Sequence, residues 1–193
     1  MQQSQSSTHP INEEEPNGFE QRLTTEALIR YMVNGNNDYE FDYKVVTVSR
    51  DKAGFLEEAI EQAEWHNFYT ISSTGEIARA DLDFDIRHGD HLVTVRTVPE
   101  GRFDKLFWSP TKAAIMTDKD RKKHYGKLEY FDGGTWTAEI PSSGQCREMR
   151  FRAKLNDDLD DKKHKFSYNV FIESITGGMR ELEIDPDIRN PSV

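Results

Sequence analysis

The chain has 193 residues, of which 35% are hydrophobic and 31% are charged, so it can build one large domain or two small ones around a substantial core. Its formal net charge of −10 argues against a nucleic-acid backbone or an anionic membrane surface as a partner. Cys146 is the only cysteine, and no stretch approaches the roughly 20 apolar residues of a membrane span, so we expect a soluble cytoplasmic protein without disulfides.

Residues 1–22 are expected to form a disordered tail. They are rich in Gln, Ser, Glu, Pro and Asn, and beyond Met1 their sizeable apolar side chains are Ile11 and Phe19. Such a segment buries too little surface to offset the entropy that it would lose on ordering.

A hairpin and a helix are predicted next. Apolar residues alternate with others along 27–33 and 39–48, and the turn-forming stretch 34–38 joins the two runs. Between 52 and 64, apolar residues recur at helical spacing, with Ser49 as the expected N-cap. The apolar face of this helix consists of Phe55, Leu56, Ala59, Ile60 and Ala63. Further strands are predicted at 68–72, 77–86 and 91–98.

This order of hairpin, helix and further strands resembles the β-grasp fold, and more narrowly the ubiquitin-like modules of bacteria. The residues that carry the resemblance are YMVNG at 31–35, VVTVSRDKAGFLEEA at 45–59 and HGDHLVTVRTVP at 88–99. They stand where such modules have the first hairpin, the second strand with the helix, and the last strand. The resemblance implies a ubiquitin-like module over residues 23–99, within an α+β protein.

Residues 100–193 have the pattern of an antiparallel β-sandwich, because short strands recur at regular spacing with turn signals between them. The last two strands, 165–173 and 179–184, are predicted to form a hairpin with Thr176-Gly177-Gly178 as its turn, and Asp185-Pro186 ends the second strand. The ending LEIDPDIRNP is similar to uncharacterised small bacterial β-sandwich proteins. Earlier strands are expected at 105–108, 112–117, 127–131, 135–140 and 148–155.

Two acidic stretches, Asp81 to Asp90 and Asp157 to Asp161, are candidate ion sites. Aspartates at alternate positions of a strand point to one side, but they lie about 7 Å apart, too far for three of them to bind one ion. Lysines follow the second stretch and would repel a cation. A solvated surface is therefore favoured for both stretches, and no metal or other cofactor is expected.

Cys146 and Gly177-Gly178 suggest two further functions. A Cys146 thiolate could serve a hydrolase with His124 or His164 as its base, although a lone cysteine at the start of a strand is more often a small apolar residue. Ubiquitin-like precursors can be cleaved after a Gly-Gly pair to expose a glycine carboxylate for conjugation, which here means cleavage after Gly178. Such cleavage would remove a predicted strand and leave an exposed edge, so a hairpin turn is favoured.

A binding patch is predicted from Tyr125, Gly133, Gly134 and Trp136, because loops on a rigid sheet are frequent binding sites. The chain has no glycine-rich phosphate loop, nucleophile elbow or His-Glu-x-x-His motif. We therefore expect a non-enzymatic intracellular adaptor with a protein partner. A modifier precursor cleaved after Gly178 and a Cys146-dependent hydrolase are the alternatives.

Overall fold

The computed structural model describes most of the chain from Pro16 onward. The described residues are 16, 18–79, 86–101, 105–112, 114–117, 124–141, 145–155, 162–173, 178–184 and 187–190. Most of the expected N-terminal tail therefore lies outside them, and the first strand begins at Gln21.

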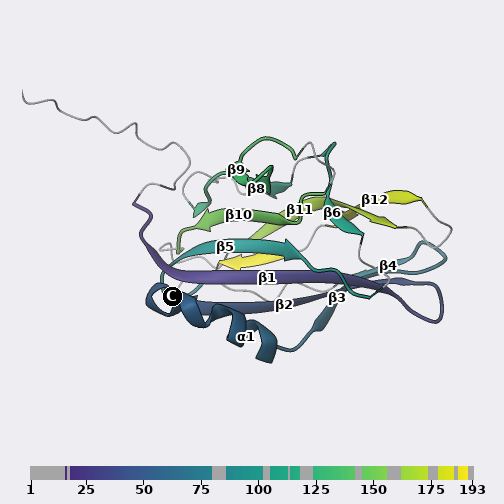
Figure 1. Cartoon of the computed structure of the whole chain (residues 1–193), viewed down its shortest axis with the longest axis horizontal. Helices are drawn as coiled ribbons and strands as arrows, with labels where there is room; N and C mark the ends of the chain where they lie inside the picture. Colours follow the sequence, from purple (N-terminus) through teal and green to yellow (C-terminus); the bar gives the residue numbers. More distant parts are fainter. Residues whose placement is uncertain are drawn as a thin grey trace, which may run out of the picture.

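In the described part of the chain, eight strands form one mixed sheet in the order β4-β3-β2-β1-β5-β10-β8-β9 (Figure 1). β1 and β5 run parallel, and the other neighbours are antiparallel. The strands are β1 (Gln21–Val33), β2 (Tyr39–Ser49), β3 (His66–Ile71), β4 (Ile77–Arg79), β5 (Asp90–Thr97), β8 (Glu129–Asp132), β9 (Thr135–Thr137) and β10 (Glu148–Ala153). The predicted first hairpin is confirmed as β1 and β2.

Five further described strands form a second sheet around β11 (Lys162–Glu173). The second half of β11 pairs with β12 (Met179–Ile184) and β6 (Leu106–Trp108), and its first half pairs with β13 (Asp187–Asn190) and β7 (Ile115–Thr117). The predicted final hairpin is confirmed, because Tyr168 lies opposite Ile184 and Glu173 lies opposite Met179.

The boundary expected after residue 99 does not separate two sheets. β10 pairs with β5, from Glu148 opposite Arg96 to Ala153 opposite His91, and β8 and β9 continue the same sheet. The strands that were expected to make a self-contained β-grasp sheet are therefore part of a larger one. The coarser class is confirmed: within the described residues this is a mostly-strand α+β fold with a single α-helix.

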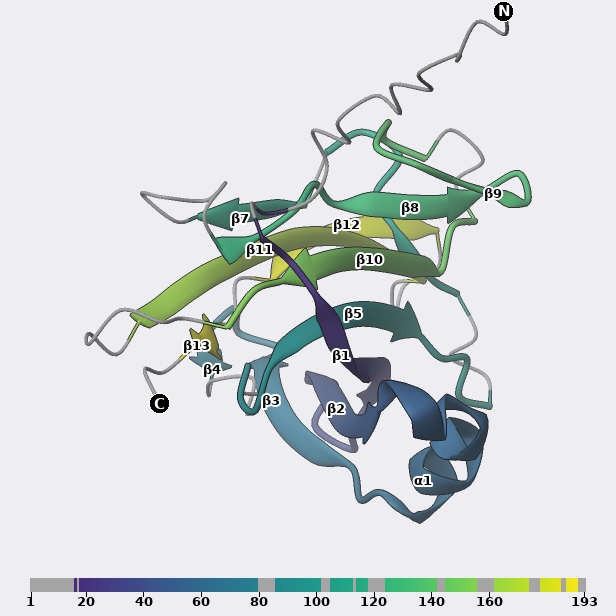
Figure 2. The same cartoon turned by 90° about the vertical axis from the view of Figure 1, so that its left-hand side faces the viewer.

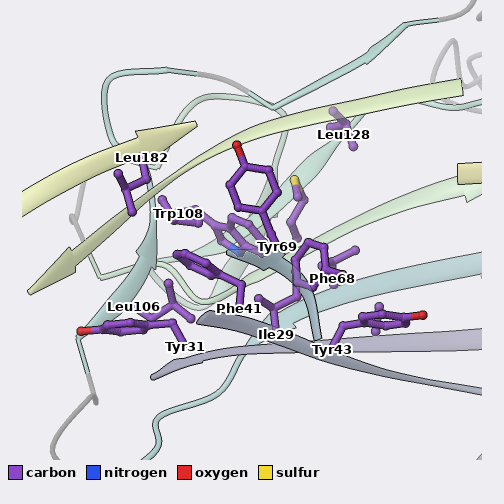
Figure 3. Packing of buried hydrophobic residues seen from close by; sticks show 14 of the residues in the cluster. Ile29, Tyr31, Phe41, Tyr43, Phe68, Tyr69, Leu106, Trp108, Leu128 and Leu182 are labelled. Carbon is purple, nitrogen blue, oxygen red and sulfur yellow. The ribbon is translucent and has the colours of Figure 1, made fainter. Parts of the chain in front are cut away.

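The two sheets pack face to face around one hydrophobic core (Figure 3). Phe41 comes from the first sheet, whereas Trp108 and Leu182 come from the second, and all three are buried. The hydroxyl of Tyr69 on β3 donates a hydrogen bond of 3.4 Å to the carbonyl of Glu183 on β12, so a polar contact also joins the sheets. Burial of these side chains is the main favourable term that holds the sheets together.

The predicted helix is confirmed in shortened form and covers part of the opposite face of the first sheet (Figure 2). A 3₁₀ turn, η1 (Arg50–Phe55), precedes α1 (Leu56–Gln62). Ile60 packs against Leu28 and Val46, and Lys44 donates a hydrogen bond of 2.6 Å to the carbonyl of Ile60. Because Leu28 lies on β1 and Val46 on β2, α1 covers the outer face of these two strands.

Candidate functional site

The outer face of the first sheet carries charged side chains beside the helix. Successive residues of a strand point to opposite faces, so the neighbours of the buried core residues Ala27, Val95, Met149 and Phe151 point outward. The register aligns Glu26, Thr94, Arg150 and Glu129 across four neighbouring strands. We call this surface the charged face, and it consists of Glu26 on β1, Arg96 on β5, Glu148, Arg150 and Arg152 on β10, and Glu129 on β8.

Arg96 lies near the helix end of the charged face. One of its terminal nitrogens lies 2.7 Å from the carboxylate of Glu26 and 4.0 Å from that of Glu57 on α1. Its Nε is buried and has no acceptor among the described residues. A buried donor without an acceptor costs free energy. The Arg96 side chain as a whole is 31% exposed, so a ligand can reach it through the exposed part of its guanidinium group.

Glu26 is a carboxyl group with a perturbed pKa. Burial raises the pKa of Glu26 above its usual value of 4.5, and the nearby carboxylates of Glu57 and Glu148 raise it further. The charge of Arg96 and its hydrogen bond act in the opposite direction and do not cancel the rise. A carboxyl group with a raised pKa, held beside an arginine on a partly open surface, is suited to proton transfer.

Glu129 joins the two arginines of β10. Its carboxylate accepts hydrogen bonds from Nε of Arg150 at 2.8 Å, from Nη2 of Arg150 at 3.3 Å and from Nη1 of Arg152 at 3.2 Å. Burial alone would raise the pKa of Glu129, but the hydrogen bonds and charges of the two arginines outweigh it and lower the pKa below 4.5. Glu129 is therefore ionised at neutral pH and fixes both guanidinium groups.

Two aromatic rings border the charged face at the end away from the helix. The guanidinium carbon of Arg150 lies 4.1 Å from the ring centre of Trp136 on β9, and the rings of Trp136 and Phe131 lie 5.2 Å apart. In Figure 2, β9 lies at one end of the row of strands, whereas α1 lies beside β2, on the other side of β10, β5 and β1. The charged face is thus bordered by a helix on one side and by an aromatic pair on the other.

The four residues of the predicted binding patch do not share one surface. Trp136 contacts the charged face, and Gly133 and Gly134 form the turn between β8 and β9, with φ angles of 59° and 85° that favour glycine. Tyr125 is only 2% exposed and packs against Phe151 in the core. Binding by Trp136 and this hairpin stays a prediction.

Cys146 lacks the surroundings of a nucleophile. It is 3% exposed, and its sulfur lies 3.3 Å from the carbonyl oxygen of Phe131 and 3.4 Å from that of Glu148. Burial, the largest cause, raises the pKa of the Cys146 thiol to about 11. The thiol is therefore protonated at neutral pH, and the expectation of a Cys146-dependent hydrolase is wrong.

Cleavage after Gly178 would dismantle the second sheet. Gly178 has a φ of 83° directly before β12, whereas Gly177 lies outside the described residues. The residues beyond Gly178 include β12 and β13, both paired with β11, and Leu182 is buried in the core. The chain beyond Gly178 is thus part of the fold, which contradicts the idea of a cleaved modifier precursor.

The acidic stretches fall largely outside the described residues, which exclude 81–85 and 157–161. Asp90 is described, and its carboxylate accepts hydrogen bonds from the backbone N–H groups of Glu20 at 2.7 Å and Leu155 at 2.9 Å, which ties the start of β1 to the end of β10. Among the described residues, no three His, Cys, Asp or Glu side chains are grouped so that they could hold a metal ion.

A hollow lies beside the hairpin of β3 and β4, apart from the charged face. This hollow of about 490 Å³ is lined by Thr70, Ser72, Glu76, Ile77 and Ala78. Its lining contains one carboxylate and no basic side chain, in contrast to the three arginines of the charged face. We therefore place the candidate site on the charged face.

A family model described as a predicted novel nucleotide synthetase matches residues 15–193. The match covers nearly the whole chain, so the chain belongs to this family. No curated protein and no solved structure matches. In the part of the chain that the structure describes, no helix has the length and apolar character needed to cross a membrane.

Membership of this family corrects three expectations from the sequence. The suspected resemblance to ubiquitin-like modules and to small bacterial β-sandwich proteins is wrong, because one other family spans both halves of the chain. The expected non-enzymatic adaptor is also wrong, because the family description names a synthetase and so points to an enzyme. The short motifs in residues 31–99 were insufficient to identify the family, because a β-hairpin followed by a helix occurs in many folds.

The residues of the charged face are not among the site residues predicted from the sequence. Glu26, Arg96 and Glu129 stand singly in three strands that lie far apart in the sequence. The alternation of Arg150 and Arg152 with apolar residues along 148–153 was a usable signal, because it places two arginines on one face of a strand. The acidic partner of those arginines, on another strand, had no such signal.

Proposed function

We propose that this chain is an enzyme that makes a nucleotide from a nucleoside triphosphate, and that the charged face is its active site. The observation that carries the proposal is the ion pair of Arg96, whose side chain is 31% exposed, with Glu26, whose pKa is raised. The family description supports the class of reaction. The arrangement of side chains on the charged face supports the location of the active site there.

Arg96 is assigned to the phosphates. A planar guanidinium group forms short, charge-assisted hydrogen bonds with phosphate oxygens, and it stays charged at any physiological pH. Arg150 and Arg152, held by Glu129, place two further guanidinium groups on the neighbouring strand. The charged face carries three arginines and three glutamates, so we assign phosphate binding to directed guanidinium hydrogen bonds and not to a net positive charge.

Glu26 is assigned to proton transfer. In the proposed step, a ribose hydroxyl group of a nucleotide attacks the α-phosphorus of the triphosphate, a new P–O bond forms, and the bond to pyrophosphate breaks. The hydroxyl proton passes to the carboxylate of Glu26. A base in this position needs a pKa closer to neutrality than that of an ordinary carboxyl group, which burial of Glu26 favours.

The test of the phosphate assignment uses the full chain with Mg²⁺ and each of ATP, GTP, CTP and UTP. Wild type is expected to release pyrophosphate and to form a new nucleotide that mass spectrometry detects. The Arg96→Gln variant should lower kcat/KM by about tenfold or more, because a charged hydrogen bond is lost, and Arg96→Lys should retain part of the activity. Arg22→Gln is the control, since Arg22 is an exposed arginine outside the charged face.

The proposal fails if wild type neither binds nor consumes any of the four triphosphates. The phosphate assignment alone fails if Arg96→Gln and Arg22→Gln have the same activity as wild type. The expected cytoplasmic location and a protein partner stay predictions that these experiments do not address.

A Glu26→Gln variant tests the proton-transfer role. Its kcat should fall by about a hundredfold or more, and its activity should lose the rise with pH that wild type shows as Glu26 ionises. Because the folded-state pKa is raised, ionisation of Glu26 lowers the stability of wild type as the pH rises through that pKa. The variant should therefore be at least as stable as wild type in thermal unfolding at neutral pH. A variant with wild-type kcat would contradict the role of Glu26.

A further inference from the structure

We propose that Trp136 and Arg150 form the nucleobase subsite of this enzyme and that the substrate is a purine nucleoside triphosphate. This inference rests on the proposed function, because it places the base of the same substrate whose phosphates contact Arg96.

The aromatic pair lies at the right place for a base. Trp136 is half-buried, and the ring of Phe131, which is 38% exposed, lies beside it with its centre 5.2 Å away. An aromatic side chain on a sheet surface, next to basic side chains, is the usual platform on which proteins stack a nucleobase. Stacking on such a platform contributes roughly 1–3 kcal/mol per base.

Arg150 adds directional hydrogen bonding to this platform. Its guanidinium group packs against Trp136 at 4.1 Å, and its hydrogen bonds to Glu129 use Nε and Nη2. Because the guanidinium lies over one face of the Trp136 ring, a base stacks on the part of the aromatic pair that Arg150 leaves open. The Nη1 group takes part in neither bond to Glu129, so it can donate to an acceptor at the edge of that base. Both purines carry the acceptor N7, to which one hydrogen of the guanidinium group can donate. A pyrimidine has a smaller stacking surface and lacks N7.

The distance across the sheet fits one extended nucleotide. Arg96 lies on β5 and Trp136 on β9, with β10 and β8 between them. Neighbouring strands are about 4.8 Å apart, so these two strands are about 14 Å apart. An extended nucleoside triphosphate can span this distance, with its base at Trp136 and its phosphates at Arg96, beside Glu26.

The experiment measures the affinity of the full chain for ATP, UTP and inorganic tripolyphosphate by calorimetry. Wild type should bind ATP more tightly than UTP. Trp136→Leu should weaken ATP binding by about tenfold, which corresponds to the loss of one stacked base, and should leave tripolyphosphate binding unchanged. Arg96→Gln should weaken the binding of ATP and tripolyphosphate alike. Phe55→Leu is the control, because Phe55 is a 64% exposed aromatic residue that belongs neither to the charged face nor to the aromatic pair.

The inference is overturned if wild type binds tripolyphosphate but Trp136→Leu leaves the affinity for ATP within twofold of wild type, or if UTP binds as tightly as ATP. If wild type binds neither ATP nor tripolyphosphate, the proposed function fails and the inference fails with it. If Trp136→Leu does not fold, Trp136→Phe takes its place, with a smaller expected loss of affinity for ATP. The ratio of the wild-type affinities for ATP and UTP still decides whether the protein distinguishes a purine from a pyrimidine.

Discussion

His91 shows how buried neighbours fix the protonation state of a single residue. The ring is 1% exposed, its Nε2 lies 2.8 Å from the carbonyl oxygen of Arg87, and its Nδ1 lies 2.7 Å from the hydroxyl of Thr25. A carbonyl can only accept, so Nε2 carries the proton and Nδ1 accepts from Thr25, whose oxygen can accept in turn from Thr47 at 2.8 Å. Burial lowers the pKa of His91, although the Arg87 carbonyl and Asp90 oppose this in part.

The first prediction follows from this lowered pKa. The unfolded chain takes up a proton at His91 near pH 6.5, whereas the folded chain does so only at lower pH, so stability should fall as the pH decreases through 6.5. Urea unfolding at pH 7.5 and pH 5.5 measures this loss. The variants His91→Asn and His91→Gln should lose less stability than wild type between the two values. An equal loss in wild type and both variants would show that His91 does not titrate on unfolding.

Single residues of the site were only partly predictable from the sequence. Trp136 was singled out as an aromatic residue near a Gly-Gly turn, and the structure places it against Arg150. Tyr125 was singled out with it, but the strand order turns Tyr125 toward the core. Whether an aromatic residue in an irregular stretch points inward depends on strands that lie far away in the sequence.

At the level of secondary structure, the helix begins later than predicted, and the backbone conformation of residues 50–55 explains why. The helical pattern placed Phe55 on the apolar face with Leu56 and Ile60, yet Phe55 is 64% exposed. Residues 50–55 form a 3₁₀ turn, which has three residues per turn and not 3.6, so the directions of its side chains do not follow those of α1. Ser49 precedes this turn and makes no side-chain capping bond.

The hairpin of β11 and β12 leads to a prediction about protein stability. Leu182 is 6% exposed and packs in the core between the sheets, whereas Met179 on the same strand is 48% exposed. Leu182→Ala should lower the free energy of unfolding by about 2–5 kcal/mol, since it removes buried methyl groups and leaves a cavity. Met179→Ala should change it by less than about 0.5 kcal/mol. Both values are measured by urea denaturation, and similar losses in the two variants would refute the placement of β12.

For the whole molecule, the main feature is that one sheet contains strands from both halves of the chain. Val93 and Val95 of β5 are buried, and their backbone pairs with Phe151 and Met149 of β10. Residues 1–99 alone would therefore lack the partner strand of β5 and much of the core that covers the first sheet. A β5 edge without its partner would be open to pairing with other chains.

We therefore expect the chain to unfold in a single cooperative transition. Tryptophan fluorescence reports on Trp65 beside the helix, Trp108 in the second sheet and Trp136 on β9, and it should change together with far-ultraviolet circular dichroism. A fragment of residues 1–99 should not fold. Two separate transitions, or a fragment with the dispersed NMR spectrum of a folded domain, would show that residues 1–99 form a domain of their own.

The sequence by itself determined the local features of this protein. Alternation placed Ala27, Ile29 and Tyr31 on the buried face of β1, and glycine with proline marked the ends of the last hairpin, because side-chain direction and turn geometry depend on neighbouring residues. Only the tertiary structure decided that β10 lies beside β5, and with it the contact of Arg96 with Glu26 and of Glu129 with Arg150. Pairing of distant strands depends on how the whole core packs, and no short stretch of sequence contains that information.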